Sequence, residues 1–215
     1  HLSIRRQRQM CIRDRGGTGI EFNFMPLSST GGFSTALMCL RQGNVYLAQD
    51  VNGKALVNFL AQSRVEVLTA SPDQFSYFIS RNQGLLFALS GIKQIRLAGS
   101  HPGAGFLRKL RAVFDADVLS VYGSTECGAI FSSDLGKKGA PTSLGRLRNG
   151  AEVRVVSENG DALPRGEQGF LETRSNSMFV GYLLDSRTMT VSSEGPWFAT
   201  CLLYTSPSPR DRTRS

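Results

Sequence analysis

The residues best suited to chemistry in this 215-residue sequence form the run Y-G-S-T-E at positions 122–126. An apolar run at residues 117–121 precedes them and predicts a strand that leads into a glycine turn. Open α/β sheets bind ligands at the carboxyl ends of their parallel strands, and Gly123 allows a close approach of the backbone. The Thr125 hydroxyl can hydrogen-bond a phosphate oxygen, and the Glu126 carboxylate is a hard ligand suited to Mg²⁺. An ordinary polar turn uses the same residue types, so the run alone leaves both interpretations open.

The two ends of the sequence resemble translated sequencing adapters. Residues 10–14 back-translate to a DNA stretch whose reverse complement encodes the Leu-Leu-Tyr-Thr of residues 202–205, so a single inverted repeat accounts for both. We therefore expect residues 1–15 and 201–215 to be non-native, the alternative being a basic targeting arm and a Pro/Ser-rich tail. These segments hold eight Arg and two Asp, which lowers the net charge from +8 to +2 over residues 16–200. The basic composition thus gives no reason to expect nucleic-acid partners.

The remaining cysteines and the hydropathy narrow the class of protein further. Cys39 and Cys127 form neither a C-x-x-C pair nor a disulfide framework. We expect a reducing compartment, the cytoplasm, and we expect Cys127 to be a buried, inert thiol. No apolar run approaches the roughly 18 residues of a membrane span, so no spanning segment is expected.

Strand and helix patterns alternate over residues 16–140. Strands are predicted at residues 20–25, 44–48, 65–70, 92–97 and 117–121, and helices at residues 34–40 and 53–64, from Pro72 onward and around residues 106–114. This alternation is typical of an α/β fold, a parallel sheet with packed helices. Residues 26–33 between the first strand and helix are expected to form a loop.

The pattern changes over residues 141–200. Alternating runs at residues 150–157 and 169–174 flank turn residues at 158–161. They predict a small antiparallel β subdomain that follows the α/β part within the same domain.

Six motifs then occur in the order found in the adenylate-forming superfamily, which includes acyl- and aryl-CoA synthetases, luciferases and the adenylation domains of peptide synthetases. In the α/β part, P-L-S-S-T-G-G at 26–32 resembles the family's P-L-x-H-x-x-G, A-G-S-H-P at 98–102 resembles its G-G-A-P adenine loop, and Y-G-S-T-E at 122–126 resembles its Y-G-x-T-E. Further along the chain, L-G-R at 144–146 resembles the family's V-G-R-P, and G-E-Q-G-F-L at 166–171 with M-F-V-G-Y-L at 178–183 resembles its G-E-x-G-E-L and G-Y. Finally, W-F-A-T at 197–200 resembles the start of the family's W-F-x-T-G-D. Together they cover essentially all of residues 16–200.

The resemblance implies an AMP-binding domain and assigns roles to its residues. Such an enzyme uses ATP and Mg²⁺ to convert a small-molecule carboxylate into acyl-AMP, then passes the acyl group to CoA or to the phosphopantetheine of a carrier protein. By resemblance Thr125 and Glu126 are catalytic, with Thr125 contacting phosphate and Glu126 holding the metal. The nucleotide-binding set would comprise Gly99, Ser100, Tyr122, Gly123, Ser124 and Thr125. The acyl-substrate pocket would comprise Ser28, Ser29, Thr30, Gly31 and Gly32.

Departures from the family pattern qualify this assignment. Ser29 stands where the family often has His, Ala98 where it has the first glycine, and His101 where it usually has alanine. The family's phosphate loop, expected before residue 16, its ribose-binding Asp, expected two residues after Thr200, and its C-terminal domain with a catalytic Lys are not found. We therefore expect the chain to be an inactive internal fragment of an adenylating ligase. The alternative is a non-catalytic nucleotide- or acyl-binding domain that kept the fold.

Overall fold

The structure is a computed structural model that describes residues 19–48, 53–136, 144–164, 166–185, 190–192 and 197–205. The expected adapter segment at residues 1–15 lies outside these ranges. The described chain forms two compact units, called here unit 1 (His1–Val121 and Ser133–Leu144) and unit 2 (Tyr122–Ser132 and Gly145–Ser215). The division at residues 140 and 141 expected from the sequence stays a prediction.

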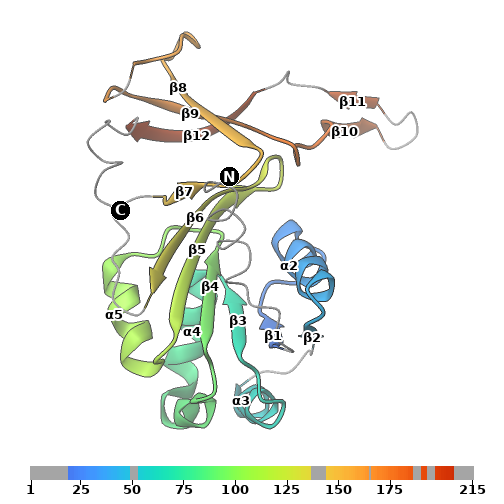
Figure 1. Ribbon diagram of the computed structural model, residues 1–215, viewed down its shortest axis with the longest axis vertical. Helices are drawn as coiled ribbons and strands as arrows, with labels where there is room; N and C mark the ends of the chain where they lie inside the picture. Colours follow the sequence, from blue (N-terminus) through green and yellow to red (C-terminus); the bar gives the residue numbers. More distant parts are fainter. Residues whose placement is uncertain are drawn as a thin grey trace, which may run out of the picture. The chain divides into compact units, whose positions relative to one another are not determined.

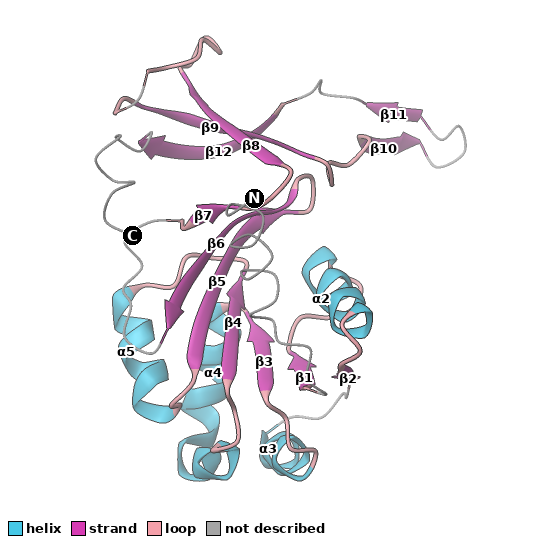
Figure 2. Cartoon of the chain, in the orientation of Figure 1, coloured by secondary structure: helices cyan, strands magenta, loops and turns pink. Residues whose placement is uncertain are grey.

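Unit 1 is the α/β layer that the alternation predicts (Figure 1). Its elements are β1 (Ile20–Asn23), α2 (Thr30–Arg41), β2 (Val45–Leu47), α3 (Gly53–Gln62), β3 (Val67–Ala70), α4 (Pro72–Asn82), the 3-10 helix η1 (Gln83–Leu89), β4 (Gln94–Ala98), α5 (Ala104–Val113) and the first part of β5 (Asp117–Ser124). All the described helices lie in this unit, as the colouring of Figure 2 makes clear.

The strands join in the order β2-β1-β3-β4-β5-β6-β7, with β6 spanning Gly128–Gly136 and β7 spanning Arg146–Leu147. The pairs β1·β2, β1·β3, β3·β4 and β4·β5 are all parallel. After β1 the chain forms β2 on one side, and it then returns to form β3 on the other side of β1. The order in which strands are added therefore reverses between β1 and β3. Open α/β sheets form a ligand crevice at such a reversal of strand order.

The two faces of the parallel sheet differ in chemistry. One face carries Phe22, Leu68, Ile95 and Leu97, which join one hydrophobic cluster with apolar residues of α3, α4, η1 and α5. This cluster is the core of unit 1, and burial of its apolar surface is the main stabilising contribution.

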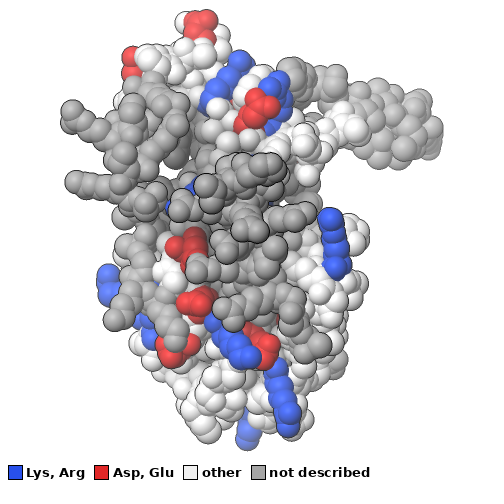
Figure 3. All heavy atoms as spheres, viewed as in Figure 1, with Lys and Arg blue, Asp and Glu red and all other residues white. Residues whose placement is uncertain are grey.

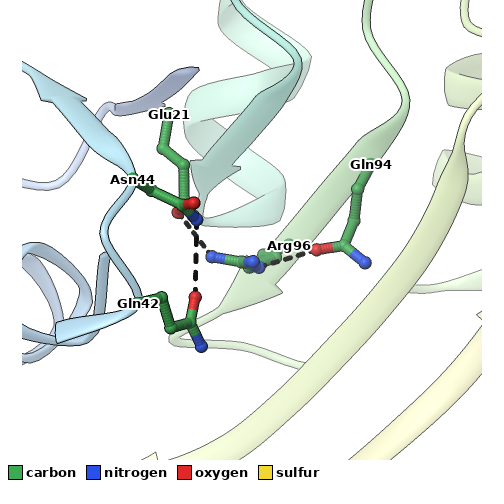
Figure 4. A network of polar contacts seen from close by, with 5 residues as sticks. All are labelled: Glu21, Gln42, Asn44, Gln94 and Arg96. Carbon is green, nitrogen blue, oxygen red and sulfur yellow. Dashed lines mark hydrogen bonds and ion pairs between the residues drawn. The ribbon is translucent and has the colours of Figure 1, made fainter. Parts of the chain in front are cut away.

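The opposite face of the sheet is polar and carries the network of contacts drawn in Figure 4, and its residues Glu21, Asn23 and Thr69 are buried. Glu21 on β1 is 1% exposed and pairs with Arg96 on β4, 2.5 Å from Nη1 to Oε2. Asn44 Nδ2 donates to Glu21 Oε1 at 2.8 Å, and Arg96 Nε donates to Gln94 Oε1 at 2.8 Å. Alternating polar residues in β1 therefore do not face solvent. Cys39 of α2 lies within electrostatic reach of Glu21 and Arg96, which places α2 on this face.

Two helix starts are set by serine caps. Ser71 accepts a hydrogen bond from Gln74 N and its own N–H donates to Gln74 Oε1, a capping box followed by Pro72, so α4 begins where the sequence predicts. The predicted loop at residues 26–33 is wrong in its second half. Ser29 caps α2, and the helix begins at Thr30 rather than at Ser34 because the Ser29 hydroxyl satisfies the N–H of Gly32.

The strand that leads into Y-G-S-T-E is longer than predicted. It runs to Ser124 instead of ending at Val121, and β6 follows after only Thr125, Glu126 and Cys127. Neighbouring strands joined by so few residues form an antiparallel hairpin. The sequence did not predict β6, because Ser132, Ser133 and Asp134 interrupt its apolar pattern.

Unit 2 is the antiparallel part. Strands β8 (Ala151–Val156), β9 (Gln168–Ser175) and β12 (Phe198–Thr205) form one sheet in the order β12-β9-β8, and β10 (Tyr182–Asp185) pairs with β11 (Thr190–Ser192). Both neighbours of β9 are antiparallel to it, which confirms the predicted antiparallel β region. Strand β12 includes residues 201–205 of the segment expected to be non-native.

The surface of the described residues shows both signs of charge. Lys and Arg side chains are interspersed with Asp and Glu on the face drawn in Figure 3. In the part of the chain that is described, no helix combines the length and the hydrophobicity that crossing a membrane requires.

Candidate functional site

The turn between β5 and β6 in unit 2 has a tightly constrained backbone. A Cβ at Gly123 would lie 2.1 Å from the carbonyl oxygen of Gly128 and 2.8 Å from Ala129 Cα, so only glycine fits there. Gly128 has φ +68°, a conformation that L side chains rarely adopt. The Cys127 N–H donates to Ser124 Oγ at 3.2 Å. These contacts fix the path of Thr125 and Glu126 across the turn.

Strand β9 anchors this turn through Cys127. The Thr173 hydroxyl donates to Cys127 Sγ at 2.9 Å, and the Ser175 hydroxyl donates to the Cys127 carbonyl oxygen at 2.6 Å. Cys127 is 1% exposed, as expected for a buried thiol. Its side chain therefore packs in the interior of unit 2, while the neighbouring Glu126 remains partly exposed.

Glu126 carries its charge in this environment. Its own backbone N–H lowers the pKa of the carboxyl, burial opposes this, and the hydroxyls of Ser124 and Tyr182 lower the pKa further. The Tyr182 hydroxyl donates to Glu126 Oε1 at 3.1 Å. Glu126 is thus an ionised, hydrogen-bonded carboxylate beside the exposed Thr125, and this pair can act on a cation and on a phosphate.

Tyr122 precedes the turn and is held against Phe131, with ring centroids 5.9 Å apart. Burial raises the pKa of the Tyr122 phenol, and a hydrogen bond with Thr200 acts in the opposite direction. The phenol therefore stays neutral at physiological pH and presents an aromatic ring next to the turn.

The single carboxylate of Glu126 is compatible with binding of Mg²⁺. Among the described residues, no group of three or more His, Cys, Asp or Glu is arranged to hold a metal ion. Mg²⁺ keeps several waters and is usually bound by one or two carboxylates together with substrate phosphates. Glu126 therefore fits an ion that binds with a nucleotide better than a permanently bound metal.

In unit 1 the start of α2 follows the carboxyl end of β1. The Ser29 hydroxyl donates to the Pro26 carbonyl oxygen at 2.7 Å and accepts from Gly32 N at 3.0 Å. A Cβ at Gly32 would lie 2.0 Å from that same Pro26 oxygen, so Gly32 allows the helix to pack on residues 25–26. Ser28 and Thr30 are exposed at a helix N-terminus, an environment that favours negative charge.

Gly99 and Ser100 follow the carboxyl end of β4. Gly99 has φ +93°, and a Cβ there would meet the Cβ of Ser71, the cap that follows β3, at 3.7 Å. The Gln74 amide next to this cap donates to the Phe24 carbonyl oxygen just beyond β1 at 3.2 Å. The segments that follow β1, β3 and β4 thus lie at one edge of the sheet, where the strand order reverses.

A family model described as AMP-binding enzyme matches residues 4–183. The chain belongs to the AMP-binding enzyme family. This confirms the resemblance to adenylate-forming enzymes inferred from the motifs.

Curated relatives and solved structures agree with the family assignment. The chain is 26% identical over 121 residues to the mitochondrial acyl-coenzyme A synthetase ACSM6 of Homo sapiens, covering 56% of the chain and 25% of that protein. It is 28% identical over 192 residues to the acyl-CoA ligase frbB of Dothideomycetidae sp., covering 87% of the chain and 34% of that protein. ATP-bound MatB from Rhodopseudomonas palustris shares the fold, with TM-score 0.71, 19% identity, and coverage of 94% of the chain and 41% of MatB. The chain spans about a quarter to a third of the two curated relatives.

Within this member of the AMP-binding enzyme family the predicted site residues fall into two sets. Unit 1 brings the pocket residues 28–32 to the same sheet edge as Gly99 and Ser100, and unit 2 gathers residues 122–126 in one hairpin. Roles for these residues stay predictions.

The sequence interpretation overlooked the residues that support the hairpin turn. Phe179 and Tyr182 belong to the motif at 178–183, which resembles the G-Y motif of the family. Both residues lie more than fifty positions after Glu126, so the sequence does not indicate that they contact it. Thr173 and Ser175 carried no signal either, because alternating hydroxyl residues in a strand are common.

Proposed function

We propose that this chain is part of an ATP-dependent acid–thiol ligase that activates a carboxylate as an acyl adenylate. The observation that carries the proposal is the ionised Glu126 beside Thr125 in the Y-G-S-T-E turn, within a chain of the AMP-binding enzyme family. Relatives named as acyl-coenzyme A synthetases or acyl-CoA ligases favour CoA as the acceptor. A carrier-protein thiol is the other acceptor consistent with the family resemblance.

The proposed chemistry is mainly electrostatic. Attack of a carboxylate on the α-phosphate of ATP requires neutralisation of the phosphate charge, which Mg²⁺ supplies when it is bound. In this chain Glu126 would hold the ion and the Thr125 hydroxyl would donate to a phosphate oxygen. Tyr122 would lie against the adenine, and the exposed Gly99 and Ser100 would line the nucleotide site.

The acyl substrate is assigned to the sheet edge of unit 1. Residues 28–32 combine exposed hydroxyls with a helix N-terminus, which suits the negative charge of a carboxylate. We also propose a reducing compartment, the cytoplasm, because Cys39 and Cys127 are free thiols.

Carboxylate-dependent exchange of pyrophosphate into ATP tests this function. The 215-residue chain by itself is expected to show none, because it corresponds to a small part of its relatives. A longer protein recovered from the source gene and containing residues 19–200 is expected to catalyse exchange with some member of a panel of carboxylic acids.

In that longer protein Glu126→Gln should lower the exchange rate by about a hundredfold, the size expected when a group that stabilises transition-state charge is lost. Glu158→Gln, at an exposed carboxylate in a turn of unit 2, is the control and should leave the rate unchanged. Nucleotide binding without exchange for any acid would instead support a non-catalytic binding domain.

A further inference from the structure

We infer that Tyr182 is a positioning residue that holds the Glu126 carboxylate in the orientation needed to bind a divalent cation. The inference rests on the proposed metal-binding role of Glu126 and adds a residue to which that role had not been linked. Both residues lie in unit 2, on the β5–β6 turn and at the start of β10.

Two contacts hold Glu126 from residues 179–182, which lead into β10. The Phe179 N–H donates to the Glu126 carbonyl oxygen at 2.8 Å, which fixes the backbone of the turn. The Tyr182 hydroxyl donates to Glu126 Oε1 at 3.1 Å, which fixes the side chain. The same short segment therefore holds both the main chain and the carboxylate of one residue.

The Tyr182 hydroxyl is itself held in place by aromatic packing. The Tyr182 ring lies edge-to-face with the Phe179 ring, with centroids 4.8 Å apart, and Phe179 packs in turn on Phe198 of β12 with centroids 5.9 Å apart. Edge-to-face contacts of this kind are a favoured and stabilising arrangement of aromatic rings. The position of the hydroxyl is therefore determined by β12 and by the segment before β10.

Within the turn the Ser124 hydroxyl and the Glu126 backbone N–H also act on the carboxylate, and Tyr182 adds a contact from outside the turn, which the anchors on β9 do not supply. Thr173 and Ser175 bind the thiol and the carbonyl oxygen of Cys127, the next residue. A partly exposed glutamate has several rotamers to choose from, and ordering it costs side-chain entropy. Hydrogen bonds from neighbouring groups commonly orient the carboxylates that bind metals, and their loss weakens metal binding.

The role is one of positioning rather than of stability. Tyr182 is 42% exposed, so water can take the place of its hydroxyl as a partner of Glu126 when the hydroxyl is removed. Tyr182→Phe keeps the ring and its packing on Phe179 and removes only the hydroxyl. We expect this variant to retain the stability of unit 2 and to lose the order of the Glu126 carboxylate.

The test uses Mn²⁺ added together with ATP as the probe on the 215-residue chain, because the ion is proposed to bind with a nucleotide. Mn²⁺ broadening of the Thr125 and Glu126 amide signals gives an apparent Kd, NMR relaxation gives the order of the Glu126 side chain, and Trp197 fluorescence in urea gives the stability of unit 2. The variants are Tyr182→Phe, Glu126→Gln and the control Tyr77→Phe, which removes the hydroxyl of an exposed tyrosine in unit 1.

Tyr182→Phe should weaken Mn²⁺ binding about tenfold and increase the motion of the Glu126 side chain, with an unchanged urea midpoint. Tyr77→Phe should match the wild-type chain in all three measurements. Phe179→Leu, which keeps the backbone N–H but loosens the Tyr182 ring, should weaken Mn²⁺ binding in the same direction and so provides a second variant.

Two results would overturn the inference, and they are distinguishable. If Glu126→Gln weakens Mn²⁺ binding but Tyr182→Phe and Phe179→Leu do not, Tyr182 has no positioning role while the proposed role of Glu126 stands. If Glu126→Gln binds Mn²⁺ as the wild-type chain does, or the wild-type signals do not broaden, the metal role of Glu126 fails and the positioning role fails with it.

Discussion

At the residue scale, Gly123 carries the strictest constraint in the hairpin. Any Cβ there would meet the backbone of β6 at Gly128 and Ala129, and a backbone cannot move aside as a flexible side chain can. Gly123→Ala should therefore destabilise unit 2 by about 2 kcal/mol, measured from the urea dependence of Trp197 fluorescence. Gly84→Ala, where a Cβ meets nothing within 4 Å, is the control and should change stability by less than about 0.5 kcal/mol. Equal effects of the two substitutions would contradict this account of the turn.

The Cys39 thiol leads to a prediction about how the stability of the chain depends on pH. Burial raises the pKa of the Cys39 thiol from its ordinary value of 9.0 to about 11, and the nearby Glu21 carboxylate acts in the same direction. Below pH 9 the thiol is protonated in both the folded and the unfolded chain. Above pH 9 it ionises first in the unfolded chain, so the free energy of unfolding falls as pH rises from 9 to 11, by at most about 1.4 kcal/mol per pH unit.

The measurement for Cys39 is a difference between two pH profiles. Urea unfolding followed by circular dichroism at pH 8 and near pH 10.5 gives the loss of stability, and Cys39→Ala should lose less over the same interval. If the wild-type chain and Cys39→Ala lose the same stability between the two pH values, the thiol does not contribute to the pH dependence of stability.

At the element scale, β1 and β4 are linked across β3 by the buried pair of Glu21 and Arg96. Removing one charge of a buried pair leaves the other without compensation. Glu21→Gln should therefore lower the free energy of unfolding by about 3 kcal/mol, measured by circular dichroism in urea. Glu66→Gln breaks the more exposed pair with Lys93 and should cost less than about 1 kcal/mol. A larger loss of stability in Glu66→Gln than in Glu21→Gln would show that the pair of Glu21 and Arg96 is not the more buried of the two.

The same elements indicate how far sequence patterns predict this fold. Apolar spacing and the Ser71 cap located the parallel strands and the four α-helices described in unit 1, because each buries one side, but they did not predict the 3-10 helix η1. They did not predict that the polar face of β1 is also buried, since alternation separates two faces but does not tell which one meets solvent. They also missed the start of α2 at Thr30, where the Ser29 cap outweighs the low helix propensity of Gly31 and Gly32.

At the scale of the whole molecule, the candidate site was predictable as short motifs but not as a set of contacts. The residues of the Y-G-S-T-E run lie within five positions of one another, so the turn could be identified as a candidate site from the sequence, although the hairpin that contains it was not predicted. The support from Phe179 and Tyr182 arises only when β9 and β10 fold back beside the turn, and local spacing contains no information about such long-range contacts.

Each unit has its own buried apolar residues, and this leads to a prediction about unfolding. The large hydrophobic cluster lies entirely in unit 1, whereas the residues of unit 2 whose burial is described include a smaller buried apolar set: Cys127, Ile130, Phe131, Ala151, Val155, Val156 and Leu171. Since burial of apolar area is the main source of stability, unit 2 should be the less stable part. Parts with separate cores can also unfold with separate midpoints.

Two signals report on the two units independently. Trp197, the single tryptophan of the sequence, contacts the guanidinium groups of Arg154 and Arg174 in unit 2, which lie 4.6 and 4.8 Å from the centroid of its ring. All the described helices belong to unit 1, so circular dichroism at 222 nm reports mainly on that unit. We expect the fluorescence midpoint in urea to lie below the circular-dichroism midpoint, and Glu21→Gln to shift only the latter. Coincident midpoints that Glu21→Gln shifts together would show instead that β5 and β6, which run through both units, make the chain unfold as one cooperative structure.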